Sequence, residues 1–197
     1  MRTIRTKIYK FSELSKEAQE KAIQNLWDIN INYEWYEPIT EGFKESNDFF
    51  DITNTFFSGF SSQGDGAMFE YSGINKDFVN TIIDSLELPN WKKEVLKNCI
   101  YVSGTGKQSG HYYHEKSCSH NIYVESDNGA QNYRNIELLI DSVDANIEEA
   151  ITDKYVELAK QLYKDLEKEY DYLTTEEAIK ETIEANDYEF TREGKQF

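Results

Sequence analysis

The chain has 197 residues, of which 37 are acidic and 21 basic, so its formal net charge is −16. A surface this anionic repels DNA, RNA and anionic lipid, which argues against direct binding to nucleic acid. No apolar run approaches the roughly 18 residues of a membrane span. The N-terminus lacks the apolar stretch of a secretory signal. The two cysteines are too few for a disulfide framework. We therefore expect a cytoplasmic protein that does not bind membranes.

The N-terminal third combines one strand with two helices. Alternating side chains predict a strand over residues 3–11, and apolar side chains at helical spacing predict an amphipathic helix over residues 15–29. A second helix is expected over residues 34–46. Pro38 is best tolerated in the first turn of that helix.

Residues 56–71, FFSGFSSQGDGAMFEY, predict a β-hairpin around which the rest of the chain is arranged. Side chains alternate with period two on both sides of a break rich in Gly and Asp. Asp65-Gly66 suits a tight turn because Gly accepts positive φ without steric penalty. We expect this to be the central hairpin of a sheet, with residues 61–66 exposed at its tip. At least two of the three side chains Phe57, Phe60 and Phe69 are expected to lie in the core.

The second half begins with two short helices, one capped by Asn75 and one starting near Pro89. A strand is expected over residues 99–103, a Gly-rich loop over residues 104–110, and one or two further strands over residues 111–125. A helical pattern with a long apolar stripe then starts near residue 133. The tail YEFTREGKQF is expected to form a last strand and turn.

This order of elements predicts an α+β fold with a largely antiparallel sheet and helices packed on one face. Residues 1–126 are expected to form the α+β core. Residues 127–197 are expected to form an acidic helical segment with a terminal strand, packed on the same domain.

The negative charge is concentrated in the C-terminal third. Residues 127–189 include 18 acidic and six basic side chains, whereas the rest of the chain includes 19 acidic and 15 basic side chains. Carboxylates three or four residues apart lie on one helical face. Such a stripe is either a solvated surface or a substitute for a phosphate backbone. We expect the stripe and the hairpin tip to bind a partner through Asp141, Asp144, Glu148, Glu149, Asp153, Glu157, Gln63 and Asp65.

No metal site, cofactor or catalytic residue is predicted. The side chains with metal-binding chemistry are His111, His114, Cys118 and His120. On a straight strand His114 and His120 stand roughly 20 Å apart, at about 3.3 Å per residue, whereas zinc ligands converge on one ion. The segment GTGKQS fails as a phosphate loop because Gln108 stands where Ser or Thr should follow the lysine.

Four segments carry a resemblance to a known family: residues 10–14, 17–22, 33–44 and 59–67. They follow the order of a strand, a Lys-Phe-x-Glu-Leu entry to a helix, a Trp/Tyr-rich second helix and a Gly-Phe-x-Ser-Gln-Gly-Asp-Gly-Ala hairpin. In these features, and in its tail, the chain resembles small phage- and prophage-encoded proteins, some of which carry the name antitoxin. In charge and size alone it is similar to anti-restriction and anti-CRISPR inhibitors.

The resemblance and the charge together favour a phage-encoded inhibitor of a host defence nuclease, such as a CRISPR effector. Its partner would be a host protein whose basic nucleic-acid-binding surface meets the acidic helices in the bacterial cytoplasm. One alternative is an antitoxin-like protein that neutralises a toxin. Another is an enzyme with a site near the SQGDG hairpin, although a non-enzyme is expected. The sequence predicts no oligomeric state.

Overall fold

The computed structural model describes residues 7–126 and 133–197, apart from the Tyr133 side chain. The chain divides into two compact units. The sheet unit is Ile39–Asp165, and the terminal unit combines Met1–Pro38 with Leu166–Phe197. The boundary expected between residues 126 and 127 falls inside the sheet unit. Parts of the expected first strand and of the acidic segment, residues 1–6 and 127–132, lie outside the described residues.

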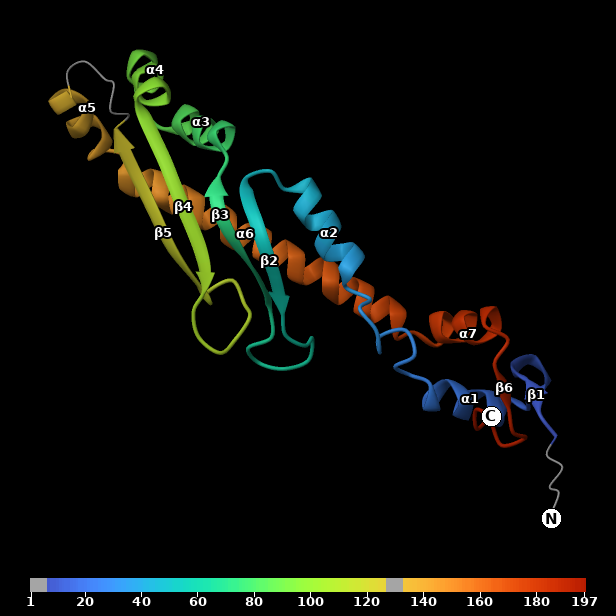
Figure 1. The fold of residues 1–197 in the computed structure, drawn as a ribbon. Helices are drawn as coiled ribbons and strands as arrows, with labels where there is room; N and C mark the ends of the chain where they lie inside the picture. Colours follow the sequence, from blue (N-terminus) through green and yellow to red (C-terminus); the bar gives the residue numbers. More distant parts are fainter. Residues whose placement is uncertain (1–6, 127–132) are drawn as a thin grey trace. The chain divides into compact units, whose positions relative to one another are not determined.

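A four-stranded antiparallel sheet forms the sheet unit, in the order β2-β3-β4-β5 (Figure 1). The strands are β2 (Phe50–Phe57), β3 (Ala67–Ile74), β4 (Ile100–Gln108) and β5 (Cys118–Ser126). The predicted α+β class with an antiparallel sheet is confirmed. The hairpin β2–β3 forms, but it lies at one edge of the sheet and not at its centre, because in the described part of the chain only β3 pairs with β2.

Strand β4 runs through residues that were expected to form a loop. Its glycines pair with β5, Gly104 opposite Ile122 and Gly106 opposite His120. These glycines make room for neighbouring side chains, since an added Cβ at Gly104 would collide with Ile74 and one at Gly106 with the Tyr71 ring. The prediction of a loop over residues 104–108 was therefore wrong. The loop is residues 109–117, most of which were expected to be strand.

Among the described residues, the helices that accompany the sheet are α2 (Glu37–Ser46), α3 (Lys76–Ser85), α4 (Asn90–Cys99), α5 (Tyr133–Ile140) and α6 (Asp144–Leu173). Helix α6 crosses one face of the sheet (Figure 1), where the Tyr155 ring lies 4.4 Å from Phe69 and 4.5 Å from His120. Phe43 of α2 reaches Phe69 as well, at 5.5 Å. The predicted apolar stripe of α6 is buried, as shown by Ile147, Ile151, Tyr155, Leu158 and Leu162.

The aromatic side chains of the hairpin are less buried than expected. Phe69 is fully buried, but Phe57 and Phe60 are half-buried, so the prediction that at least two of the three lie in the core was wrong. Phe57 stacks on Phe60 at 5.7 Å, and Phe60 lies 5.5 Å from Tyr163. They stay partly exposed because an edge strand and the loop after it have neighbours on fewer sides than a central strand.

Strands β3 and β4 are joined by a single pair, Tyr71 opposite Gly106. Beyond that pair the carboxylate of Glu70 bridges the strands. It accepts hydrogen bonds from the backbone N–H of Gln108 at 3.1 Å and from Asn54 Nδ2 at 2.9 Å, and it pairs with Lys107 Nζ at 3.4 Å. The side chain thus replaces part of the missing backbone ladder.

The Glu70 bridge predicts a pH-dependent contribution to stability. The hydrogen bond from Asn54, then that from Gln108, lowers the pKa of Glu70 below its ordinary value of 4.5. A lowered folded-state pKa stabilises the fold above pH 4.5, and this contribution is lost as the pH falls through the folded-state pKa. Glu70→Gln should therefore cost about 1 kcal/mol at neutral pH. Urea unfolding of both proteins should show this difference shrinking in acid; a difference independent of pH would contradict the prediction.

The terminal unit joins the two ends of the described chain. Strands β1 (Tyr9–Lys10) and β6 (Glu189–Phe190) pair antiparallel, accompanied by the 3₁₀ helix η1 (Phe11–Glu13), α1 (Lys16–Asn25) and α7 (Glu176–Ala185). Its core consists of Phe11, Leu14, Ala18, Ala22, Ile179, Ile183 and Phe190. The predicted terminal strand is confirmed. Of the described part of the expected first strand, residues 7–11, the structure forms Tyr9–Lys10 as a strand, which ends where the chain turns into η1 at Phe11.

Among the described residues, no helix combines the length and the apolar character that crossing a bilayer requires.

Candidate functional site

The acidic residues of α6 lie on two different sides of the helix. An α-helix turns by about 100° per residue, so residues four apart share a side. Glu149, Asp153 and Glu157 form one line, which we name the solvent row. Asp144, Glu148 and Thr152 form a second line, which we name the groove row. The stripe expected from sequence is therefore divided between two surfaces.

The solvent row lies opposite the buried stripe of α6, and its three side chains are exposed. Among the described residues Glu149 and Asp153 form no ion pair, whereas Glu157 pairs with Lys154 at 3.1 Å. Successive carboxylates of the solvent row are about 6 Å apart along the helix axis, whereas successive phosphates along one DNA strand are about 3.4 Å apart. The row can bind a few cationic groups, but it is more dilute in charge than a phosphate backbone.

The groove row lies beside β5. Glu148 and Thr152 line a groove of about 270 Å³ together with four consecutive residues of that strand, His120–Tyr123. Glu148 is exposed and Asp144 is half-buried. The other expected acidic residue, Asp141, is exposed in the turn between α5 and α6.

The hairpin tip is organised around Asp65. Its carboxylate accepts hydrogen bonds from the backbone N–H groups of Ser61 at 2.8 Å and Ser62 at 2.6 Å, so it holds the loop together. Positive φ occurs at Gly64, at 104°, and not at Gly66. Gly66 is required for another reason, because an added Cβ there would lie 2.5 Å from the Cβ of His114. Of the two expected binding residues, the exposed Gln63 is the one not engaged in the loop's hydrogen bonds.

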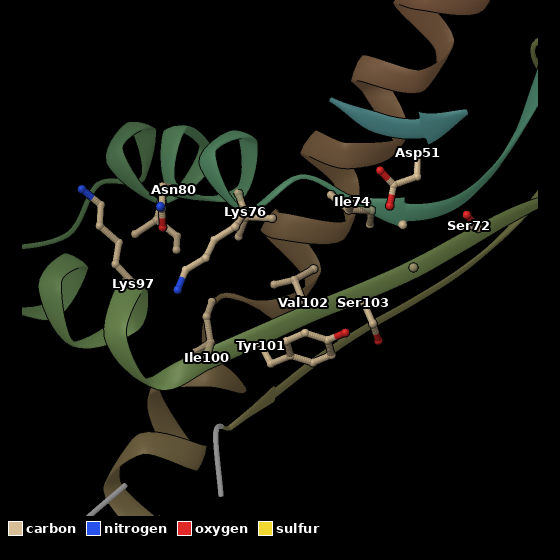
Figure 2. Close-up of a pocket in the computed structure, with 14 residues that line it drawn as sticks. Asp51, Ser72, Ile74, Lys76, Asn80, Lys97, Ile100, Tyr101, Val102 and Ser103 are labelled. Carbon is tan, nitrogen blue, oxygen red and sulfur yellow. The ribbon is translucent and has the colours of Figure 1, made fainter. Parts of the chain in front are cut away.

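A cavity of about 420 Å³ opens where β3 and β4 separate (Figure 2). It is lined from five elements of the sheet unit: β2, the end of β3, helices α3 and α4, and the start of β4. None of the expected binding residues lies in it. Sequence reasoning missed this cavity because its walls come from segments far apart in the chain.

The cavity is polar at both ends and contains no Cys or His. Figure 2 shows the amine of Lys76 directed towards β4 and the carboxylate of Asp51 near the end of β3. Lys97 contributes its aliphatic stem, since its ammonium pairs with Asp84 at 2.6 Å. The site can hold a small polar molecule, but its lining provides no nucleophile paired with a histidine base.

Cys118 and His120 lie under α6 beside two tyrosines. Burial raises the pKa of the Cys118 thiol, which keeps it protonated and weakly nucleophilic. His120 Nδ1 lies 3.9 Å from that sulfur and 3.0 Å from the hydroxyl of Tyr71, with which it shares a hydrogen bond. Burial also lowers the pKa of His120. The cluster therefore has the character of a polar core contact more than that of a thiol catalyst.

The other two histidines lie in the loop of residues 109–117. Their expected position on a straight strand was wrong, because β5 begins only at Cys118. His114 Nδ1 accepts a hydrogen bond from the backbone N–H of Lys116 at 3.0 Å. Within residues 7–126 and 133–197, no three His, Cys, Asp or Glu side chains are grouped closely enough to hold a metal ion.

One family model matches the part of the chain that contains the sheet unit. A family described as a domain of unknown function, DUF8835, matches residues 35–176. The chain belongs to the DUF8835 family. The DUF8835 match includes the whole sheet unit and both rows of α6, but it leaves out η1, α1 and β6. No curated protein and no solved structure matches the chain.

Proposed function

We propose that this protein is a phage-encoded inhibitor that binds the basic, nucleic-acid-binding surface of a host defence nuclease. The nuclease is of the CRISPR effector type, and binding takes place in the bacterial cytoplasm. The solvent row supports the proposal: Glu149 and Asp153 present exposed carboxylates, without ion pairs among the described residues, on a helix anchored by its buried stripe. Rigid, preorganised charge costs little ordering entropy on binding.

Two further observations support a binding role for this surface. The net charge of −16 steers the protein towards cationic partners. The cavity in the sheet and the Cys118–His120 contact provide no evident catalytic machinery. Because the solvent row is dilute in charge, it would contact a few Lys or Arg side chains of the partner, and binding should weaken with salt.

The proposal is tested by phage plating on bacteria that carry one defined nuclease-based defence each. The intact protein should raise plating efficiency, and Glu149→Lys with Asp153→Lys should abolish this effect by juxtaposing like charges. The matched control is Glu177→Lys with Glu181→Lys, an equal charge change on exposed residues four apart in α7. The control should protect fully.

Three results would contradict the proposal. One is full protection by the variant reversed at the solvent row. Another is equal loss in the two double variants, which would indicate a general effect of net charge. The third is no gain in plating against any nuclease defence, combined with rescue of bacteria from a toxin, which would favour the antitoxin alternative.

A further inference from the structure

Strand β5 presents a regular, unpaired edge. It pairs with β4 along all nine of its residues, from Cys118 to Ser126, and among the described residues no strand lies on its other side. In an antiparallel sheet the backbone groups alternate between the two sides, so those facing away from β4 have no strand partner among the described residues. The other edge strand, β2, has register shifts that interrupt its ladder.

The sequence and the pairing of β5 lack the features that usually prevent strand addition. Its sequence, CSHNIYVES, contains no Pro or Lys and a single charged residue, Glu125. Protected edges are typically short, bulged, rich in charge or covered by a helix or loop. Helix α5 packs against β5, but the groove beside His120–Tyr123 is open, so the regular edge is suited to accept another extended chain there.

The groove row determines which extended chain fits. The groove of about 270 Å³ runs beside His120–Tyr123, and its far wall is Glu148 and Thr152. Glu148 forms none of the ion pairs found among the described residues. Asp144 lies one turn earlier on the same side of α6. A strand added to β5 would point every second side chain towards these carboxylates.

We propose that the β5 edge and the groove row form a strand-addition site for an extended, basic segment of a partner protein. The backbone of the segment pairs with β5, which supplies affinity, and Lys or Arg at alternate positions meets Glu148 and Asp144, which supplies specificity. A second copy of this chain fits less well, because a symmetric β5–β5 pair would bring two copies of the groove row, each with Glu148, to the same sheet edge. The expectation that the partner is basic rests on the proposed function; the strand-addition site itself does not.

The test uses the intact protein and a defined probe, the end-blocked peptide Thr-Lys-Val-Lys-Thr-Lys-Val-Lys-Thr. Its binding is measured by fluorescence anisotropy, and amide hydrogen exchange reports where it binds. Glu148→Lys should weaken binding by about tenfold or more because it juxtaposes like charges. Glu41→Lys, the same charge change at an exposed residue of α2 in the sheet unit, should have little effect. Exchange should slow in β5, and a peptide with every amide N-methylated should not bind.

Equal weakening by Glu148→Lys and Glu41→Lys would overturn the proposal, because the peptide would then follow net charge alone. Binding of the N-methylated peptide, or unchanged exchange in β5, would also overturn it. Protection of β5 without peptide, rising with protein concentration, would mean that a second copy occupies the edge. Failure of the inhibitor proposal can be told apart from failure of the strand-addition proposal. The inhibitor proposal is tested by Glu149 and Asp153 in the plating assay, and the strand-addition proposal by Glu148 in peptide binding.

Discussion

Tyr155→Ala should destabilise the sheet unit by about 3–5 kcal/mol, the usual cost of truncating a large buried aromatic side chain. The side chain has no exposed surface, and its ring contacts Phe50, Phe69, Tyr71 and His120. Its hydroxyl donates to the backbone oxygen of Phe69 at 2.9 Å and accepts from the backbone N–H of the same residue at 3.3 Å. The Tyr155 hydroxyl thus hydrogen-bonds the backbone of β3, a strand that has a single residue pair with β4.

Tyr155→Phe separates the two contributions. It keeps the ring but leaves both backbone groups of Phe69 without the hydroxyl, which should cost about 1–3 kcal/mol. Hydrogen exchange of β3 amides measures the loss in the sheet unit. Tyr172→Ala, at a side chain that is 54% exposed on the same helix, should change little. If all three variants lose the same stability, Tyr155 does not anchor α6 to the sheet.

Phe190→Ala should unfold the terminal unit. Phe190 has no exposed surface, lies 6.1 Å from Phe11 between ring centroids, and pairs with Tyr9 across β1 and β6. Its truncation should cost about 3–5 kcal/mol. A single core in a chain segment this short rarely contributes more than about 3–5 kcal/mol in total. The loss is therefore comparable to the whole stability of the unit.

The control is Phe197→Ala, in the same tail but at a side chain that is 73% exposed. It should leave the terminal unit folded. Hydrogen exchange of α1 and α7 amides distinguishes the variants, because these helices should lose protection only when Phe190 is truncated. Protection retained in Phe190→Ala would show that the remaining apolar contacts of the core suffice without it.

Several local elements could be predicted from the sequence because their signals lie within a few residues of each other. Asn75 caps α3 as expected, by accepting a hydrogen bond from Asp77 N–H at 2.7 Å. Helical spacing predicted the buried stripe of α6 correctly. Period-two alternation predicted strands on both sides of the hairpin break.

Glycines show where local signals were ambiguous. Gly104 and Gly106 indicated a loop, yet both lie inside β4, because the Ile74 and Tyr71 side chains occupy the space that a Cβ would take. In the sequence, a glycine required for close packing cannot be distinguished from a glycine required for a turn. Only the neighbours across the sheet distinguish them.

The binding surfaces were predictable in part. The sequence indicated exposed carboxylates on α6, and most of the expected residues are exposed. It could not separate Glu148 from Glu149, because spacing identifies shared sides of a helix but not which side meets β5. Asp65 was expected to bind a partner, and its hydrogen bonds hold the hairpin loop instead.

The sequence by itself determined the α+β class, the acidic character of α6 and the local elements, because helical and strand periodicity depend on residues close together in the chain. Tertiary structure alone decided that the two ends of the chain form one unit, since the pair of Tyr9 with Phe190 joins residues far apart in sequence. It also decided the edge position of the hairpin, the cavity between β3 and β4, and the groove beside β5. These features depend on which buried faces meet, and many pairings satisfy the same periodicity.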